Sequence, residues 1–291
     1  MKSLYKSETG RNEILALYDQ KLKSLNIDYQ TILIETSFGH TNIIATGDPS
    51  APPLVIVHGS NGCAPISLET YPNLSKSYRV FAVDVPAQPN KSAETRMSMK
   101  NDDYGIWMNE VMQSLEIENV TMVGFSLGGL VILKALEYDE SRIKEVFLAA
   151  PAYIANGNPL KALLKIFIPL RVYMYTTKTK YVERFLDVLF TNRDEFAFQF
   201  LSKVLLHFIL DFSPVPVISK TKARSIQTPI TLFAAKKDVL FPGEKMIKRA
   251  IEIFSSLKET ILLEDSKHVQ NRSHNDQIEK TILESISSLV A

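Results

Sequence analysis

Residues 123–129 read Val-Gly-Phe-Ser-Leu-Gly-Gly and place Ser126 between two glycines, where one apolar run ends and a longer one begins. Residues 120–123 are typical of a buried strand, and the run that follows Ser126 is typical of a helix that is apolar nearly all round. A serine on a tight turn between such elements has unusual backbone angles and a hydroxyl clear of its neighbours. Side chains two positions away would crowd the turn, which explains Gly124 and Gly128.

The turn has a chemical consequence for the serine. A hydroxyl becomes a strong nucleophile only when a base removes its proton and donors stabilise the oxyanion that forms. Ser126 precedes a helix, whose free N–H groups, including that of Leu127, are able to stabilise negative charge. The same pattern also arises by chance in glycine-rich turns, or with a serine that only caps its helix. The junction of a buried strand with a buried helix favours the nucleophile.

Strands and helices alternate on both sides of this turn. Short β-branched runs predict strands, and apolar residues spaced three and four apart predict helices. The expected strands lie at residues 29–36, 41–45, 54–57, 80–83, 120–123 and 145–149, with helices at residues 11–25 and 101–116. This alternation indicates right-handed crossovers and an α/β fold with a mostly parallel central sheet flanked by helices.

The alternation breaks after Pro151. Residues 153–225 show no clear strand pattern and are rich in aromatic residues, so we expect a helical insertion there. The pattern resumes with strands at residues 230–234 and 260–263 and with helices at residues 242–254 and after residue 276. The predicted core therefore combines residues 1–152 with residues 226–291, and residues 153–225 form a helical insertion.

With these features the chain resembles the α/β-hydrolase family, and in particular its serine hydrolases with a helical cap, such as carboxylesterases. The resemblance covers nearly the whole length and implies the order nucleophile, acid, histidine, each in a loop after a strand. Asp238 is the only carboxylate in the loop at residues 235–242, and His268 follows the strand at residues 260–263. The resemblance therefore implies that His268 is the general base for Ser126 and that Asp238 orients the imidazole.

A second motif of the family lies at residues 58–62, which read His-Gly-Ser-Asn-Gly after a strand. By this resemblance, the backbone N–H groups of Ser60 and Leu127 form the oxyanion hole. We expect a structural role for His58, with a role as the base as the alternative. We expect Cys63 to be a small packing residue rather than a nucleophile.

Alternatives also remain open for the acid and the base. Asp238 is alternatively a solvated turn residue, and His274 is an alternative base to His268. Asp265 is a weaker candidate for the acid because it precedes the histidine by only three residues. The family often has glycine before this histidine, where Lys267 stands in this chain.

The loop at residues 84–92 departs from the family as well. Many relatives carry glycines where this chain has Ala87 and Pro89, so we expect a different path near the entrance of the site. Asp84, at the start of the loop, is expected to be structural rather than a second acid.

These features predict a serine hydrolase that cleaves carboxylic esters with an apolar portion through an acyl-enzyme, without a cofactor or a metal. The resemblance implies that residues 153–225 are a helical cap insertion over the nucleophile, and a cap rich in apolar side chains would enclose an apolar pocket. Carbon–carbon bond hydrolases and cofactor-free peroxidases of this fold keep the same three residues and remain alternatives. A different class is a non-catalytic small-molecule receptor, in which the serine or the histidine is often lost.

Composition limits the partners of the chain. A net charge of +1 over 291 residues argues against nucleic acid as a partner. The chain has one cysteine and its first ten residues lack an apolar signal segment, so we expect a cytoplasmic protein without an internal disulfide. No apolar run approaches the roughly 20 residues of a membrane span. We expect a monomer or a homodimer.

Residues 158–184 interleave Lys and Arg with apolar residues, and Glu183 is their only acid. Such a stretch is able to contact an anionic membrane surface. We favour a solvated helix face instead, because Pro169 is expected to interrupt a long amphipathic helix.

Overall fold

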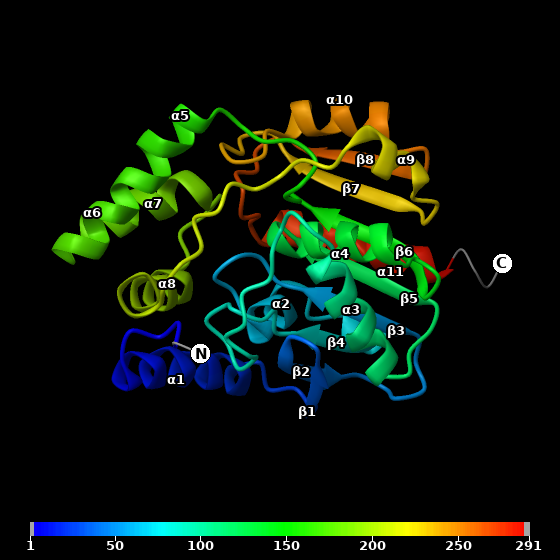
Figure 1. Cartoon of the computed structure of the whole chain (residues 1–291), viewed down its shortest axis with the longest axis horizontal. Helices are drawn as coiled ribbons and strands as arrows, with labels where there is room; N and C mark the ends of the chain where they lie inside the picture. The colour runs from blue at the N-terminus through cyan, green and yellow to red at the C-terminus, as the bar shows by residue number, and fades with distance from the viewer. Residues whose placement is uncertain (1–2, 288–291) are drawn as a thin grey trace.

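The computed structural model describes residues 3–287, which form one eight-stranded sheet with helices on both faces (Figure 1). The strands are β1 (Tyr29–Thr36), β2 (Gly39–Thr46), β3 (Pro53–Val57), β4 (Arg79–Val83), β5 (Val120–Phe125), β6 (Ile143–Ala149), β7 (Ile230–Ala235) and β8 (Leu257–Leu263). Their order across the sheet is β1-β2-β4-β3-β5-β6-β7-β8. The pairs β1–β2 and β2–β4 are antiparallel and the others are parallel, so the predicted α/β fold is confirmed.

The predicted core also contains helices, which flank the sheet. Its helices are α1 (Glu8–Ser24), α2 (Ala64–Thr70), α3 (Asp103–Ser114), α4 (Leu127–Tyr138), α10 (Gly243–Ile253) and α11 (Arg272–Ser287), with a 3-10 turn, η1, at Leu74–Lys76. The sequence did not predict α2, because a helix of 7 residues is too short to show a clear 3.6-residue period. Within residues 3–287 we find no helix long and apolar enough to cross a bilayer.

The two faces of the sheet carry separate apolar cores. Along β3, Val55 and Val57 belong to the core that contains α3, α4 and α10, whereas Leu54 and Ile56 belong to the core that contains α2 and α11. Because β3 is covered on both faces, its sequence is continuously apolar instead of alternating. Residues 127–136 of α4 are all buried, as the apolar sequence after the serine turn predicts.

Residues 153–225 are all described, and their regular elements are helices, with two isolated bridge residues, no strand and an irregular stretch at residues 209–219. Their regular helices are α5 (Pro159–Ala162), α6 (Ile168–Thr176), α7 (Thr179–Leu189), α8 (Glu195–His207) and α9 (Lys220–Ser225). The group from α5 to α8 lies to one side of the sheet, on the left of Figure 1, whereas α9 packs against α4 and α10. The division of the chain into a core and a cap stays a prediction.

The expectation for Pro169 is wrong. Residues 159–176 are helical throughout, because a π-helical turn, η2 (Leu163–Phe167), joins α5 to α6. Proline has no N–H to donate and its ring clashes with the carbonyl of the preceding turn in a regular α-helix. The wider turn immediately before Pro169 changes the spacing of the carbonyls there, so the helix continues past the proline.

The N-terminal segment is attached to this helical group. The backbone N–H of Lys6 donates to the carbonyl of His207, and that of Ile209 donates to the carbonyl of Leu4, both at 2.8 Å. α1 and α8 pack so closely that a Cβ atom on Gly10 would lie 2.6 Å from the His207 side chain. The start of the chain therefore supports the outer helices as well as the sheet.

Candidate active site

Ser126 lies on the sharp turn between β5 and α4. Its φ of 53° and ψ of −111° are strained for a residue with a side chain. Two backbone hydrogen bonds hold the turn, one from Ser126 N–H to the Ala149 carbonyl at 3.1 Å and one from Ala152 N–H to the Ser126 carbonyl at 2.9 Å. The end of β6 therefore fixes the position of the serine.

The glycines beside Ser126 are required by close approaches of backbone. A Cβ atom on Gly128 would lie 2.1 Å from the Val57 carbonyl oxygen, and one on Gly124 would lie 2.7 Å from the Gly128 carbonyl oxygen. Real Cβ atoms do not approach backbone this closely. The crowding that the sequence pattern predicts is present on both sides of the serine.

The structure brings Ser126, Asp238 and His268 into one chain of hydrogen bonds. His268 Nε2 lies 3.0 Å from Ser126 Oγ, and His268 Nδ1 lies 2.7 Å from Asp238 Oδ2. The exposed fractions of the three residues are 6%, 4% and 5%, in chain order. The hydrogen bonds assign a proton to Nδ1, which donates to the carboxylate and leaves Nε2 to accept from the serine hydroxyl.

Asp238 is held by its own loop after β7. Its Oδ1 accepts the backbone N–H groups of Leu240 at 2.7 Å and Phe241 at 3.1 Å, while Oδ2 faces His268. A buried carboxylate with both oxygens bonded is not a solvated turn residue. The rival carboxylate of Asp265 instead accepts from Lys237 Nζ at 2.7 Å and is exposed.

His268 follows β8 and lies between two aromatic rings. The ring centroids of Phe125 and Phe241 lie 5.1 Å and 5.5 Å from that of the imidazole. The alternative base, His274, lies in the first turn of α11, and its ring Nδ1 is buried without a hydrogen-bond partner among residues 3–287. Burial lowers the pKa of His274, partly offset by the charge of Asp265. His268, and not His274, is hydrogen-bonded to Ser126.

The loop after β3 lies against the serine. A Cβ atom on Gly59 would come within 3.2 Å of Ser126 Cβ, so the backbone of this loop lies beside the nucleophile position. Within the described part of the chain, the N–H groups of Ser60 and Leu127 donate to no protein acceptor. Both donors are therefore free to bind a third group.

His58 holds this loop through hydrogen bonds of its ring to backbone groups. Its Nδ1 lies 2.8 Å from the Gly59 carbonyl oxygen, and its Nε2 accepts the N–H of Val85 at 3.0 Å. Burial lowers the pKa of His58 to about 4, so the ring is neutral at pH 7. A neutral imidazole with both nitrogens bonded to backbone has the structural role that the sequence favoured.

Asp84 holds the next segment of the same loop. Its side chain accepts from Ala64 N–H at 2.7 Å, from Asn42 Nδ2 at 2.8 Å and from Lys91 N–H at 3.3 Å. Burial raises its pKa to about 6, against the lowering effect of these hydrogen bonds. Burial also raises the pKa of the Cys63 thiol, so this cysteine packs as an uncharged side chain.

Sequence reasoning missed the residues that hold the His268 loop from outside. Thr191 Oγ1 accepts the N–H of Lys267 at 3.0 Å and donates to the Val269 carbonyl at 2.7 Å. The N–H of Val269 donates to the Leu189 carbonyl at 2.8 Å. These partners lie at the end of α7 and just after it, about a quarter of the chain away, and no pattern in the sequence signals the contact.

Lys267, which stands where the family often has glycine, has a structural use here. Its Nζ donates to the Asp187 carbonyl of α7 at 2.6 Å. Gln88 has a comparable use at the other side of the site, because its Oε1 accepts the N–H of Asn61 at 2.8 Å. The 84–92 loop thus supports the loop that carries Ser60. Among residues 3–287, no group of three or more His, Cys, Asp or Glu side chains is arranged to hold a metal ion.

Comparison with known proteins identifies the fold. A family model described as the alpha/beta hydrolase fold matches residues 52–190, which carry Ser126 and the loop after β3. The chain has the α/β-hydrolase fold. The eight-stranded sheet, mostly parallel and with the serine turn after β5, agrees with this assignment. The fold and the carboxylesterase relatives described next together support a hydrolytic enzyme.

Two relatives of this α/β-hydrolase come from one bacterium. The uncharacterized carboxylesterase nap of Bacillus subtilis (strain 168) is 28% identical over 293 residues, which cover 94% of this chain and 89% of the relative. Carboxylesterase YbfK of the same strain is 34% identical over 138 residues, which cover 46% of either chain. The crystal structure of naproxen esterase (carboxylesterase NP) from B. subtilis matches with a TM-score of 0.81 at 23% identity, covering 97% of this chain and 99% of the other.

Proposed function

We propose that this α/β-hydrolase cleaves carboxylic esters with an apolar portion, and that Ser126, His268 and Asp238 carry the reaction through an acyl-enzyme. The observation that carries the proposal is the continuous chain of hydrogen bonds from Ser126 Oγ through His268 to Asp238, at 3.0 Å and 2.7 Å. The names of the relatives support an ester as the substrate, since two of them are carboxylesterases.

In the first half of the reaction, Ser126 Oγ attacks the ester carbonyl carbon while His268 Nε2 takes the hydroxyl proton. The imidazolium that results is stabilised by Asp238, which already accepts the Nδ1 proton. Collapse of the tetrahedral intermediate breaks the bond to the alcohol oxygen, and His268 returns the proton to that oxygen. The alcohol leaves, and the acyl group stays on the serine.

In the second half, a water molecule takes the place of the alcohol. His268 removes a proton from the water as it attacks the acyl carbon, and then gives the proton to Ser126 Oγ when the acid leaves. The same hydrogen-bonded groups serve both halves. No cofactor or metal is required for either step.

Negative charge on the carbonyl oxygen needs donors in both halves. We assign this task to the N–H groups of Ser60 and Leu127, which have no protein acceptor within residues 3–287. Leu127 is the first residue of α4, where the helix dipole also favours an anion. His58, whose Nδ1 lies 2.8 Å from the Gly59 carbonyl oxygen, orients the peptide group that contains the Ser60 N–H.

The preference for an apolar portion rests on what surrounds the imidazole. Phe125 and Phe241 flank the His268 ring, and Leu127 begins the helix behind the serine. Residues 153–225 would form the cap over this site, with the end of α7 already bonded to the His268 loop. An ester with a greasy acyl or alcohol group fits such surroundings better than a sugar.

The alternative functions use the same fold. Carbon–carbon bond hydrolysis and perhydrolysis need the same three side chains, and the carboxylesterase relatives favour ester cleavage over both. A non-catalytic receptor has no need of a histidine hydrogen-bonded to both serine and carboxylate. A cytoplasmic location and a monomeric or dimeric state stay predictions.

The test is covalent labelling followed by kinetics. A fluorophosphonate probe should label the parent on Ser126 and leave Ser126→Ala unlabelled, as peptide mass spectrometry would show. Hydrolysis of p-nitrophenyl esters of increasing acyl length should fall by about 10⁶-fold in Ser126→Ala, the order of loss that follows when a serine protease loses its nucleophile. Equal ester turnover by the two proteins would refute the assignment, and labelling without turnover of any ester would point to the other reactions of the fold.

A further inference from the structure

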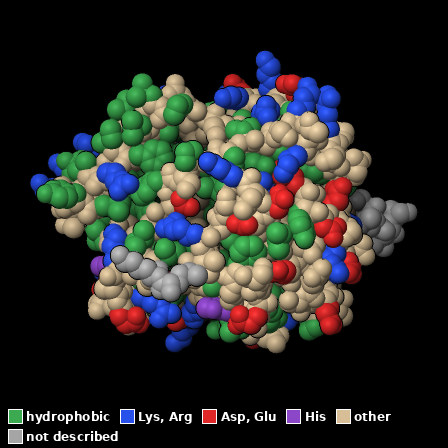
Figure 2. Space-filling model, viewed as in Figure 1, with side chains coloured by type: hydrophobic (Ala, Val, Ile, Leu, Met, Phe, Trp, Pro, Cys, Tyr) green, Lys and Arg blue, Asp and Glu red, His purple; other side chains and the backbone are tan. Residues whose placement is uncertain are grey.

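The surface of α5, η2 and α6 exposes large apolar side chains in one place. We call this group the apolar cap patch; its members have exposed fractions of 37–61% and are Leu160, Leu163, Leu164, Phe167, Ile168 and Phe212. The rings of Phe167 and Phe212 meet edge to face with centroids 6.2 Å apart, so the loop after α8 continues the patch. Single exposed apolar residues are ordinary, whereas a contiguous group of this kind marks a contact surface. Figure 2 shows these helices covered with hydrophobic side chains at the upper left.

Positive charge surrounds the patch. Residues 158–190 contain six Lys and Arg residues against Glu183 and Asp187, a net charge of +4, whereas the whole chain carries +1. The six are all exposed and are Lys161, Lys165, Arg171, Lys178, Lys180 and Arg184. Within residues 3–287 none of them forms an ion pair with a carboxylate.

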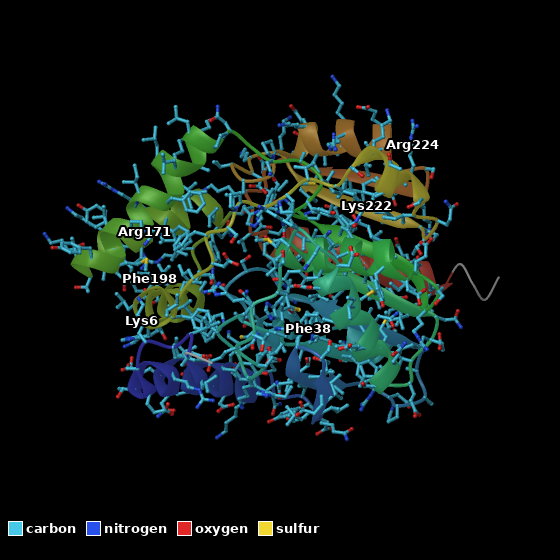
Figure 3. The ribbon with its side chains drawn as sticks, in the orientation of Figure 1. Lys6, Phe38, Arg171, Phe198, Lys222 and Arg224 are labelled. Carbon is cyan, nitrogen blue, oxygen red and sulfur yellow. The ribbon has the colours of Figure 1, made fainter. Side chains whose placement is uncertain are left out.

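Arg171 joins the charge to the apolar surface. Its guanidinium lies 4.2 Å from the centroid of the Phe212 ring. Lys6 lies on the same side of the molecule as Arg171 (Figure 3). The pKa of Lys6 is lowered mainly by burial and in addition by the positive charge of Arg171. Because none of the six cations pairs with a carboxylate within residues 3–287, they are available to anionic groups outside the chain.

The continuous helix gives the surface its shape. Because the π turn carries the helix past Pro169, residues 159–176 present apolar and basic side chains along a single rod. A helix with Leu and Phe on one face and Lys and Arg beside them lies in the plane of a lipid interface, with the apolar groups below the headgroups and the cations among the phosphates. This is the arrangement found here.

We propose that the apolar cap patch and the six exposed cations of residues 158–184, which we call the basic rim, dock on the surface of an anionic phospholipid bilayer. A second copy of the chain fits less well, because a two-fold contact through the patch would bring the same unpaired cations face to face. An anionic lipid is complementary to both features, because its acyl chains would contact the apolar cap patch and its phosphates would contact the basic rim. The docking goes beyond ester hydrolysis and does not require it.

Vesicle flotation tests the docking with the full chain. The parent protein should float with vesicles of phosphatidylcholine plus phosphatidylglycerol at low salt and should stay behind with phosphatidylcholine alone. High salt should weaken the binding, because surface charges are screened. A parent that stays behind with anionic vesicles at low salt would overturn the proposal.

Two sets of variants separate the lipid contact from general effects. Leu163→Ser with Leu164→Ser should reduce partitioning by about tenfold or more, and its control is Leu33→Ser, a residue of β1 that is 62% exposed. Replacing Lys161, Lys165 and Arg171 by Ala should reduce it on the order of 100-fold, since each basic residue near an anionic surface contributes about fivefold. The control for charge replaces Lys23, Lys100 and Lys248, which are exposed and without ion pairs within the described chain.

The variants also give the outcomes that reject the proposal. Each patch variant must keep the parent's melting temperature, and its flotation must fall while that of its control does not. Equal losses in patch and control variants would mean that no specific surface is involved. A parent that is a dimer by light scattering, and that Leu163→Ser with Leu164→Ser converts to a monomer, would show that the patch binds a second copy.

Discussion

Replacing Thr191 by valine tests whether the end of α7 sets the position of the His268 imidazole, the proposed general base. Valine keeps the shape of the side chain and removes the hydroxyl, which bonds to the residues on both sides of His268. The Val269 carbonyl keeps a hydrogen bond from the Thr191 backbone N–H at 3.0 Å. The N–H of Lys267 loses its acceptor, so the strain falls on the residue directly before the histidine.

The magnitude follows from this lost hydrogen bond. A partly buried N–H without an acceptor costs about 1–3 kcal/mol, which the loop reduces by turning the N–H toward water. That movement displaces His268, whose Nε2 must stay near 3.0 Å from Ser126 Oγ. A misplacement of about 1 Å is worth up to about 100-fold in rate. We therefore expect kcat to fall by about 5- to 100-fold in Thr191→Val, with KM nearly unchanged.

Three variants measured with one p-nitrophenyl ester make this test specific. Thr191→Ser keeps the hydroxyl and should recover most of the parent kcat. Thr176→Val removes another hydroxyl of the same helical group, one that donates to the Val172 carbonyl at 2.8 Å, and should leave kcat unchanged. The reasoning is refuted if Thr191→Val has the parent kcat, or if Thr191→Ser loses as much as Thr191→Val.

Three further predictions follow from the site. His268→Ala should reduce kcat/KM by several orders of magnitude and His274→Ala should leave it nearly unchanged; the reverse result would transfer the role of base. Gly128→Ala should lower the free energy of unfolding by about 3 kcal/mol or more in urea, because the new Cβ would meet a backbone carbonyl at 2.1 Å. Burial raises the pKa of Asp84 from 3.8 to about 6, so between these pH values the native state holds a proton on this carboxyl that the unfolded state has lost. Protonation of Asp84 therefore stabilises the native state at pH 4, and this stabilisation is lost as the pH rises through 6. Relative to Asp84→Asn, the parent should lose up to about 3 kcal/mol between pH 4 and pH 7, and parallel curves would contradict this.

The Asp84 comparison must use the difference between the two proteins. Burial lowers the pKa of His58 to about 4, so its titration makes stability rise with pH over much of the same range. The two effects oppose each other in the parent alone. Since His58 is present in both proteins, its contribution largely cancels in the difference.

Much of the fold was predictable because burial leaves a pattern in residue type. β3 and β5 are covered on both faces and are therefore apolar throughout, and α4 is apolar nearly all round for the same reason. The three side chains that the sequence singled out come from loops after β5, β7 and β8, whose carboxyl ends share one edge of the sheet. The order of strands brings them together without any local signal between them.

The helix through Pro169 shows where residue type misleads. Proline normally ends a regular α-helix, and the rule fails here because one wider turn precedes it. Whether a chain kinks, stops or widens at a proline depends on what its next turns pack against. Ile166 and Leu170, one on each side of the proline, are both buried, so tertiary contacts stabilise the continued helix. Such contacts are not visible in the local sequence.

The active site combines both kinds of information. The strained backbone at Ser126 costs about 1–3 kcal/mol. The tight space around it excludes every side chain at positions 124 and 128, so both must be glycine and the turn is recognisable in the sequence. Thr191 contacts the same site through hydrogen bonds to backbone groups of Lys267 and Val269. Nearly every residue type has these backbone groups, so the contact does not restrict which residues stand at positions 267 and 269. Serine, asparagine or water would serve as acceptors of the same N–H in other chains. The proposed nucleophile can therefore be read from residue types, whereas Thr191, which contacts the loop of the proposed base, becomes visible only when the two loops are seen in contact.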